Sequence, residues 1–396
     1  MRIATITFQQ NATNQMDDLF AQIADTQNDL ASGTTLHSAA DNPAAMTQVN
    51  TLNIQMSASK QYVANGNYAS STLQLEEQAM SDATNTLQSA RDLAVEANNP
   101  SLSASQRADI ASQLAQQLQS LIAIGNRVDG NGNQLFSGNA SDTVPFSQSG
   151  TTVTYNGSTM VSQVQIGPNQ RISSADSGAA VFMNIPAGNG TFVTSGAATN
   201  TGTGSIGVGT VTTPSAWVPD TYKISFTSPT DYTVTNGAGT VVTSGTNFVD
   251  GNSISFNGAQ IPITGTPAAG DTFTVAKAGS ASAFSTLQDL VNTLNDPTLS
   301  NAQISSKIGN SLQQIDNSIA NLSNVSAAVG ARINSITSSQ GAAQALQTNL
   351  TTAVSQLSDT DYAAAVTQLS TQEVSLQAAQ ESYASISKLS LFNYLQ

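Results

Sequence analysis

The chain has 396 residues with a formal net charge of −14, and only 9% of its residues are charged. Its 11 Lys and Arg residues form no basic cluster, which argues against nucleic acid and anionic membranes as main partners, because both need concentrated positive charge. With no Cys and one His, the chain lacks the residues for the usual zinc sites, thiol catalysis or haem ligation, and we expect no metal and no cofactor.

The N-terminal region is predicted to be a helix with a narrow apolar stripe. Its apolar residues are spaced mainly three, four or seven apart and are Met16, Leu19, Phe20, Ile23 and Leu30. Such spacing is typical of a coiled-coil seam. Gly33 follows at a position suited to a helix C-cap, so we expect the first helix to end there.

Two further helices are predicted before the pattern changes. Asp-Asn-Pro at 41–43 can start the first of them, because a side-chain oxygen can cap free amides and proline suits the first turn. This helix should run to about Ala97, and its adjacent Glu76 and Glu77 are interpreted as a solvated face. The next helix has apolar residues at steps of four, four and three: Ile110, Leu114, Leu118 and Leu121.

Between about residues 142 and 283 apolar and polar residues alternate, as they do around Tyr222 and Ile224. A period of two indicates strands, and Asn-Gly at 236–237 and Asp-Gly at 250–251 are signals of hairpin turns. The stretch 195–209 is nearly all Gly, Ser, Thr, Ala and Asn, and is predicted to be a flexible connection between two β-rich pieces.

The C-terminal region returns to helical spacing. A short helix should end at Asp296, and a long helix follows with apolar residues from Ile304 to Leu357. A polar break at 358–361 separates this helix from the last one. The last helix has its apolar residues seven apart: Leu369, Leu376 and Tyr383.

These elements predict an α+β fold in which both chain ends form a long antiparallel helical bundle or coiled coil. Neither end can bury its stripe alone, so pairing them is the simplest arrangement. The expected domains are a terminal coiled coil (1–40 with 359–396), a helical bundle with a β-hairpin (41–143 with 284–358), and an inserted β-rich outer domain (144–283). The terminal stripes bury too little apolar surface to offset the ordering of the chain, and we expect these helices to fold on assembly.

One segment begins like a calcium-binding loop. Asp-Gly-Asn-Gly-Asn at 129–133 has the right first residues. However, Gln134 and Ala140 stand where such a loop needs Gly and an acidic ligand. We therefore expect a tight turn that opens a β-hairpin at 134–136.

Two other patterns resemble active-site motifs without their context. The Gly-x-Gly-x-x-Gly match at 202–207 neither follows a clear strand nor opens a helix, as a dinucleotide fingerprint would. His37 and Asp41 lie in a predicted loop between helices and lack the oxyanion hole and strand scaffold of a triad. We expect no catalytic residue and no enzyme.

Several segments of the first 140 residues, in the correct order, resemble motifs of the flagellin family. Leu-Ala-Ser-Gly at 30–33 and Leu-His-Ser-Ala-Ala-Asp-Asn-Pro-Ala at 36–44 look like its N-terminal signature. Residues 91–97 resemble its Arg-x-Leu-Ala-Val-x-Ala helix, and residues 129–138 resemble its hairpin element. Thr35 departs from the basic residue that flagellins usually carry there.

Two more segments are similar to the branch of this family that joins the hook to the filament. The end of the chain, 389–395, resembles the terminus of that branch, and residues 222–275 are similar to a β module of hook-associated proteins. The resemblance implies a structural subunit whose paired terminal helices line the filament core and whose β domain faces outward. It also implies an extracellular flagellar protein, exported unfolded without a cleaved signal peptide.

The resemblance implies four partners: further copies in a helical ring layer, hook-associated protein 1 on the hook side, flagellin on the filament side, and an export chaperone at the C-terminal helices. Neither nucleic acid nor membrane is among them. The residues expected at the assembly interface lie on the terminal helices: Met16, Leu19, Phe20, Ile23, Leu30, Leu369, Leu376, Tyr383, Leu391 and Phe392.

Two alternatives stay open at this point. Flagellin itself belongs to the same class, and the number of copies per filament would distinguish it from a junction protein. A secreted carbohydrate-binding or hydrolytic protein would need an aromatic platform or convergent carboxylates. Only Trp217, with Tyr222 and Tyr232 nearby, resembles such a platform, and isolated aromatic residues in a β region are usually core.

Overall fold

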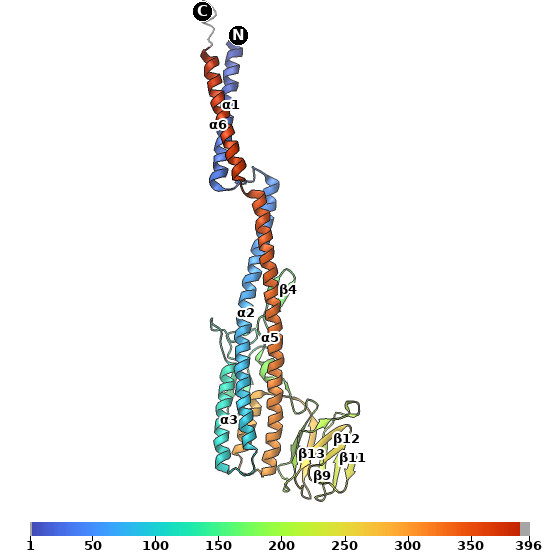
Figure 1. Ribbon diagram of the computed structural model, residues 1–396. Coiled ribbons are helices and arrows are strands. Elements are labelled where there is room, and N and C mark those ends of the chain that lie inside the picture. Colours follow the sequence, from blue (N-terminus) through green and yellow to red (C-terminus); the bar gives the residue numbers. More distant parts are fainter. Residues whose placement is uncertain (1, 389–396) are drawn as a thin grey trace, which may run out of the picture. The chain divides into compact units, whose positions relative to one another are not determined.

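The computed structural model describes residues 2–388, and the side chains of residues 6–386. Helices form both ends of the chain and strands its middle (Figure 1), which confirms the predicted α+β class. The α-helices in this part of the chain are α1 (Arg2–Ser32), α2 (Pro43–Ala97), α3 (Ala104–Gly125), α4 (Ala283–Asn295), α5 (Asn301–Ser358) and α6 (Tyr362–Lys388). None of these helices is long and apolar enough to span a membrane.

By its internal contacts the chain divides into two compact units, one of residues 1–63 with 340–396 and the other of residues 64–339. The division falls inside α2 and α5, whereas the sequence-based boundaries follow the breaks between helices. The reason is that α2 and α5 already pair with each other in the first unit. There, the Ser59 hydroxyl donates to the Ala343 carbonyl oxygen at 3.0 Å.

The helices begin and end at residues that suit their termini. Pro43 is the first residue of α2, and Asn42 Oδ1 accepts a hydrogen bond from an amide of the first turn at 3.0 Å. Gly33, which follows α1, has a φ of +75°, a conformation that glycine adopts without strain. At the start of α3, Ser103 and Gln106 cap each other's backbone amides. The sequence-predicted ends of α1 and α2 are confirmed.

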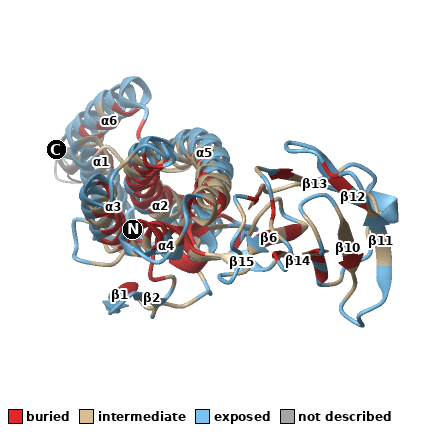
Figure 2. Ribbon diagram, turned by 90° about the horizontal axis from the view of Figure 1, so that it is seen from below, coloured by how far each residue is buried: buried red, intermediate tan, exposed pale blue. Residues whose placement is uncertain are grey.

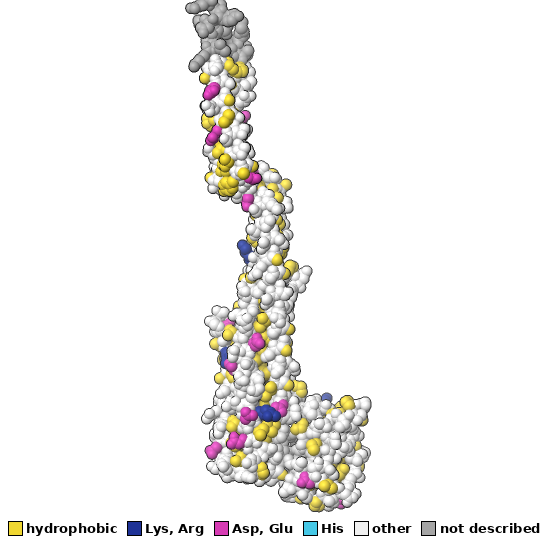
Figure 3. Space-filling view, in the orientation of Figure 1, with side chains coloured by type: hydrophobic (Ala, Val, Ile, Leu, Met, Phe, Trp, Pro, Cys, Tyr) yellow, Lys and Arg dark blue, Asp and Glu magenta, His cyan; other side chains and the backbone are white. Residues whose placement is uncertain are grey.

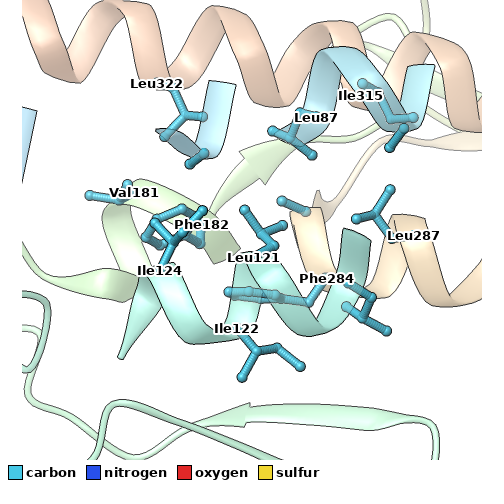
Figure 4. Close-up of a cluster of buried hydrophobic side chains, with 14 of the residues drawn as sticks. Leu87, Leu121, Ile122, Ile124, Val181, Phe182, Phe284, Leu287, Ile315 and Leu322 are labelled. Carbon is cyan, nitrogen blue, oxygen red and sulfur yellow. The ribbon is translucent and has the colours of Figure 1, made fainter. Parts of the chain in front are cut away.

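In the unit 64–339, helices α2, α3, α4 and α5 enclose an apolar core, drawn in red between the helices in Figure 2. Each helix contributes a stripe with the spacing that the sequence shows. Close up, side chains from all four helices and from the short helix η1 (Ala179–Met183) point toward one another (Figure 4). Buried members are Leu73, Met80, Leu87, Leu114, Leu118, Leu121, Leu287, Leu290, Ile308, Ile315 and Leu322.

Aromatic rings close one side of this core. The Phe284 ring of α4 lies 4.7 Å from the ring of Phe146 and 5.6 Å from that of Phe182, measured between centroids. Phe136 and Tyr155 extend the cluster through Phe182 and Phe146. Tilted and edge-on contacts of this kind add to the stabilisation from burial. The cluster therefore fixes the first β segments onto α4.

The strands form two hairpins and a two-sheet domain. Hairpin β1–β2 (Phe146–Ser149, Thr152–Tyr155) precedes hairpin β3–β4 (Gln163–Gly167, Gln170–Ser173). The first sheet has the order β11-β10-β9-β14-β6 and the second the order β12-β13-β7, with β8 beside β13. Their bounds are β6 (Phe192–Gly196), β7 (Ser205–Ile206), β8 (Thr210–Val211), β9 (Tyr222–Phe226), β10 (Tyr232–Thr235), β11 (Val241–Gly245), β12 (Ser253–Phe256), β13 (Ala259–Thr264) and β14 (Thr272–Lys277). Short β5 (Ile185–Pro186) and β15 (Ser280–Ala281) pair beside them, and η2 is Pro214–Ala216.

Both sheets share an apolar core separate from that of the helices. It includes Phe192, Ile206, Ile224, Ile261 and Phe273, which come from five strands. Trp217 packs at its edge, with its ring 5.1 Å from that of Phe192. We call the two sheets and this core the outer β domain.

The segment 195–209 is not the flexible connection that its composition predicts. It begins in β6, which pairs with β14, and it contains β7, which pairs with β13. Between them, the buried Asp271 carboxylate accepts hydrogen bonds from the amides of Thr201 (2.8 Å), Gly202 (3.1 Å) and Ala268 (2.8 Å). Small polar residues are required here for close approach: a Cβ on Gly202 would lie 2.3 Å from the Ala268 nitrogen.

The turn signal at 250–251 is also used differently from the prediction. The chain passes there from β11 to β12, which lie in different sheets, so no hairpin forms. Asp250 instead accepts a hydrogen bond from the Gly265 amide at 2.6 Å. At 236–237 the predicted hairpin turn between β10 and β11 is present.

A row of amide side chains on α5 binds the backbone of β6 and of the segment that precedes it. Asn310 Nδ2 donates to the Thr194 carbonyl oxygen at 2.7 Å. Asn317 Nδ2 donates to the carbonyl oxygens of Pro186 (2.9 Å) and Gly188 (2.8 Å). Because β6 ends its sheet, Asn310 satisfies a carbonyl group that a further strand would otherwise pair, whereas Asn317 holds the segment that leads into β6.

Replacing Asn317 by Ala is expected to destabilise the outer β domain by about 1–2 kcal/mol, because the carbonyl groups of Pro186 and Gly188, in the segment that leads into β6, lose their donor. Urea unfolding followed by the fluorescence of Trp217, the single tryptophan of the chain, measures this change. Asn334→Ala, at an exposed position on the same helix, is the matched control and should leave the midpoint within the error. Equal urea midpoints for the two variants would show that the Asn317 side chain contributes nothing to the stability of the outer β domain.

Candidate assembly interface

The terminal helices α1 and α6 pair with each other along an apolar seam. Ile23 and Leu376 are buried between them, and the Thr26 hydroxyl donates to Gln372 Oε1 at 3.1 Å. Where α1 ends and α6 begins, the Thr360 hydroxyl donates to the Asp29 carbonyl oxygen at 3.1 Å. The pairing of the two chain ends therefore agrees with the predicted fold.

The predicted interface residues do not share one environment. Ile23 and Leu376 are buried, and Phe20 is exposed. Leu391 and Phe392 lie outside the described residues. The remaining members are half-buried: Met16, Leu19, Leu30, Leu369 and Tyr383. Within one subunit the seven-residue step therefore marks the seam between α1 and α6.

Sequence reasoning missed a second set of apolar residues that lie off this step. Val366 and Val374 of α6 are exposed, Val374 to 65%. On α1, Ile6 and Phe8 are exposed as well, beside the predicted Phe20. In the space-filling view, apolar side chains accordingly appear on the surface over α1 and α6 (Figure 3). The only signal in the sequence was an apolar residue outside the seam register.

A shallow groove runs beside this seam. It has a volume of about 690 Å³ and lies between α1 and α6. Its lining is mostly small residues of α6 with two residues of α1: Leu19, Gln22, Ala363, Ala364, Thr367, Gln368, Thr371, Gln372 and Ser375. Small side chains let another helix approach closely, as in packed helix pairs.

The loop after α1 is held by its own polar residues. His37 Nε2 lies 2.8 Å from Asp29 Oδ1, and the Asp41 carboxylate accepts hydrogen bonds from the amides of His37 (2.9 Å) and Ser38 (2.7 Å). These amides, that of Ser38 first, hold the pKa of Asp41 below its usual value. Asp29, His37, Ser38 and Asp41 thus hold the loop in place, and they belong to no strand of the described chain.

The other motifs also serve local structure. Asp129 Oδ1 accepts hydrogen bonds from the amides of Asn131 and Asn133, both at 2.8 Å, so the calcium-like sequence is a turn. The hairpin expected at 134–136 is reduced to a single bridge between Val128 and Gln134. Among the residues that the structure describes, no three His, Asp or Glu side chains gather where they could hold a metal.

Glu76 is buried, which corrects the prediction that it lies on a solvated face. Its side chain is 0% exposed, Oε1 accepts a hydrogen bond from the Asp176 amide at 3.0 Å, and Oε2 has no partner in the described structure. Burial raises the pKa of Glu76 from 4.5 to about 8, with a further rise from the Asp176 carboxylate, while the Arg332 guanidinium lowers it. Glu77 is exposed as predicted, because adjacent helical side chains diverge.

Comparison with known families gives matches along most of the chain. Residues 3–141 match the N-terminal helical region of bacterial flagellin, and residues 312–395 match its C-terminal helical region. Residues 195–277 match the D2-like domain of flagellar hook-associated protein 1. The flagellin-type regions therefore coincide with the two helical ends, and the third match lies in the outer β domain.

Solved structures narrow the assignment. The crystal structure of flagellar hook-associated protein 3 from Legionella pneumophila has a TM-score of 0.75 and 30% identity, and the comparison covers 78% of this chain and 98% of that one. The chain belongs to the hook-associated protein 3 family. The family resemblance seen in the sequence is thereby confirmed, and the hook-associated protein 3 assignment is favoured over flagellin.

Two other members of the hook-associated protein 3 family illustrate the extent of the match. The flagellar junction protein FlgL from Legionella pneumophila is 31% identical with a TM-score of 0.68, over 74% of this chain and 99% of that one. Flagellar hook-associated protein 3 of Escherichia coli is 30% identical over 119 residues, which span 30% of this chain and 38% of that relative. The chain is thus a component of the flagellum.

Proposed function

We propose that this chain is a structural subunit that joins the hook to the flagellin filament, and not an enzyme. The observation that carries the proposal is the α1–α6 pair, which leaves large apolar side chains exposed on both helices. Fully burying one such side chain is worth about 1.5–3 kcal/mol, so a neighbour that covers several of them is held firmly. Similarity to the Legionella junction protein supports the same function.

A junction subunit needs one axial face for the hook side and another for the filament side. Head-to-tail contacts provide this, because they leave different surfaces at the two ends and stack copies into a helical layer. The partners in this proposal are further copies of the chain, hook-associated protein 1 on the hook side and flagellin on the filament side. The match of residues 195–277 to a domain of hook-associated protein 1 supports a relationship with that neighbour.

The proposed contacts combine the predicted residues with the exposed set. Met16, Leu19, Ile23, Leu30, Leu369, Leu376 and Tyr383 hold or flank the seam, Phe20 lies exposed beside it, and Leu391 and Phe392 belong to the same proposal. Exposed apolar helices would associate prematurely inside the cell. An export chaperone at the C-terminal helices, and export to the cell exterior without a cleaved signal peptide, therefore belong to the proposed function.

Replacing Val374 by Asp is expected to abolish filament attachment and leave the monomer folded, because a charge is placed on an exposed surface that assembly must bury. Leu376→Asp should also abolish attachment. It should lower the helical content of the monomer as well, since Leu376 is only 9% exposed and packs against α1. Complementing a deletion strain, then scoring swimming and secreted flagellin, measures the first effect, and circular dichroism of purified monomers measures the second.

Val241→Asp is the matched control, because Val241 is an exposed valine of the outer β domain, on β11. This variant should swim normally. The deletion strain itself should make hooks and release unattached flagellin into the medium. Normal swimming of the Val374→Asp strain, or a deletion strain with full-length filaments, would rule out the proposed function.

A further inference from the structure

The buried Glu76 takes part in a cluster with two half-buried charged residues, and assembly through α1 and α6 does not use this cluster. The cluster joins three elements: Glu76 from α2, Asp176 from the segment after β4, and Arg332 from α5. Arg332 forms an ion pair with Asp176, whose amide donates to Glu76. These are the charged groups that act on Glu76 from the elements packed against it.

The charges of this cluster balance only when Glu76 carries a proton. With Glu76 ionised, two carboxylates share one guanidinium, and a charge remains in a site where water has no access to the Glu76 side chain. Removing such a charge from water is costly, and the group takes up a proton instead. The ionised form would receive a single hydrogen bond, from the Asp176 amide to Oε1, which is little stabilisation for a buried carboxylate.

The cluster also controls how the segment 173–177 is attached. Arg332 Nη1 donates to the Ser173 carbonyl oxygen at 3.5 Å, at the end of β4. Hairpin β3–β4 also contacts α5 through a hydrogen bond from Gln170 Nε2 to the Ser335 hydroxyl at 3.0 Å, and its Ile166 is buried in the helical core. Within the segment 173–177, Asp176 is the residue that links α2 with α5, through Glu76 and Arg332.

We propose that Glu76, Asp176 and Arg332 form a proton-dependent latch that closes the segment 173–177 onto helices α2 and α5. In the closed latch Glu76 is protonated at neutral pH, and Asp176 is free to pair with Arg332. Loss of the Glu76 proton sets the two carboxylates in competition for Arg332. The segment then loosens while the apolar core of the helices stays intact.

The sign of the pH dependence follows from the direction of the pKa change. Between the ordinary pKa of 4.5 and the folded pKa of about 8, the folded chain holds a proton that the unfolded chain has lost. The unfolding equilibrium constant should therefore rise about tenfold for each pH unit across this window. Stability from this source is greatest at the acidic end, falls through the window, and is level above the folded pKa.

Urea unfolding of the full chain, followed by circular dichroism between about pH 5 and 9, tests the latch. The test variant is Glu76→Gln, and the control is Glu77→Gln at the exposed neighbouring position. Between about pH 5 and 8 the unfolding equilibrium constant of the wild type should rise by a factor that is about a thousandfold larger than the factor for Glu76→Gln. Glu77→Gln should follow the wild type. Hydrogen-exchange protection of 173–177, corrected for intrinsic rates, should fall above about pH 8 in wild type alone.

A pH profile of Glu76→Gln identical to that of wild type would overturn the proposal, as would full protection of 173–177 at every pH. If Glu76→Gln does not fold, carboxyl carbon-13 spectra of the wild-type chain with labelled glutamate decide the question. All other glutamates are exposed, namely Glu77, Glu96, Glu373 and Glu381. One resonance should titrate near the alkaline end and the others near the ordinary value, and uniform ordinary titration would end the proposal.

Discussion

Replacing Asp271 by Ala is expected to destabilise the outer β domain by about 3–5 kcal/mol. The Asp271 carboxylate is buried and accepts three backbone amides, from Thr201, Gly202 and Ala268. Hydrogen bonds to a charged group contribute about 1.5–3 kcal/mol each, and the amides that lose their acceptor are partly buried. Asp271→Asn should cost less, since its carbonyl oxygen still accepts while its amino group faces donors.

Two probes distinguish unfolding of the outer β domain from unfolding of the helices. Trp217 is the only tryptophan, and it packs in the outer β domain between the rings of Phe192 and Tyr222. The fluorescence midpoint in urea should move to lower concentration in Asp271→Ala. The main circular dichroism transition, dominated by helices, should stay in place, because the two apolar cores are separate.

The control for Asp271 is Asp250→Ala in the same domain. Asp250 is exposed and accepts a single amide, that of Gly265, so its loss should cost about 1 kcal/mol or less. If Asp271→Ala and Asp250→Ala shift the Trp217 transition equally, the segment around Thr201 is not held by Asp271. If both probes shift together in Asp271→Ala, the outer β domain does not unfold on its own.

Phe284→Ala is expected to lower the stability of the helical core by about 3–5 kcal/mol. The Phe284 ring is fully buried and contacts the rings of Phe146 and Phe182 from α4. Its removal leaves a cavity at the point where helices and first β segments meet, and rigid neighbours such as these collapse poorly into a void. The circular dichroism midpoint in urea measures the loss.

Phe20→Ala provides the comparison for Phe284, because Phe20 is exposed on α1. In the monomer it should change the midpoint by no more than about 0.5 kcal/mol. The Trp217 transition should move little in Phe284→Ala, in contrast to its response in Asp271→Ala. A loss below about 1 kcal/mol for Phe284→Ala would mean that the aromatic cluster is not part of the folding core.

Periodicity and capping signals together predicted the long helices and their breaks. The seven-residue step of Leu369, Leu376 and Tyr383 predicted α6, and the Asp-Asn-Pro signal at 41–43 predicted the start of α2, because capping and stripe spacing act within a few residues. Strand alternation likewise predicted β9 around Ile224. Such features are local, so a single sequence carries them.

Small polar composition was a poor guide at 195–209. The same Gly, Ser and Thr residues that occur in flexible linkers also allow the close backbone approach that Asp271 requires, and composition does not distinguish the two uses. The deciding residue lies about seventy positions further along the chain. Local reasoning therefore predicted mobility where a buried carboxylate imposes order.

The amino-acid sequence by itself determined the helical ends, the breaks between helices, the β-rich middle and the family, since periodic stripes, caps and short motifs are properties of neighbouring residues. Only the tertiary structure decided the environment of Glu76, which the helix pattern placed in solvent and which packing against Asp176 and Arg332 buries. It also decided which apolar residues of α6 line the seam and which, such as Val374, remain exposed. Burial depends on elements that come together from distant parts of the chain, and a helix does not specify alone which of its faces will be covered.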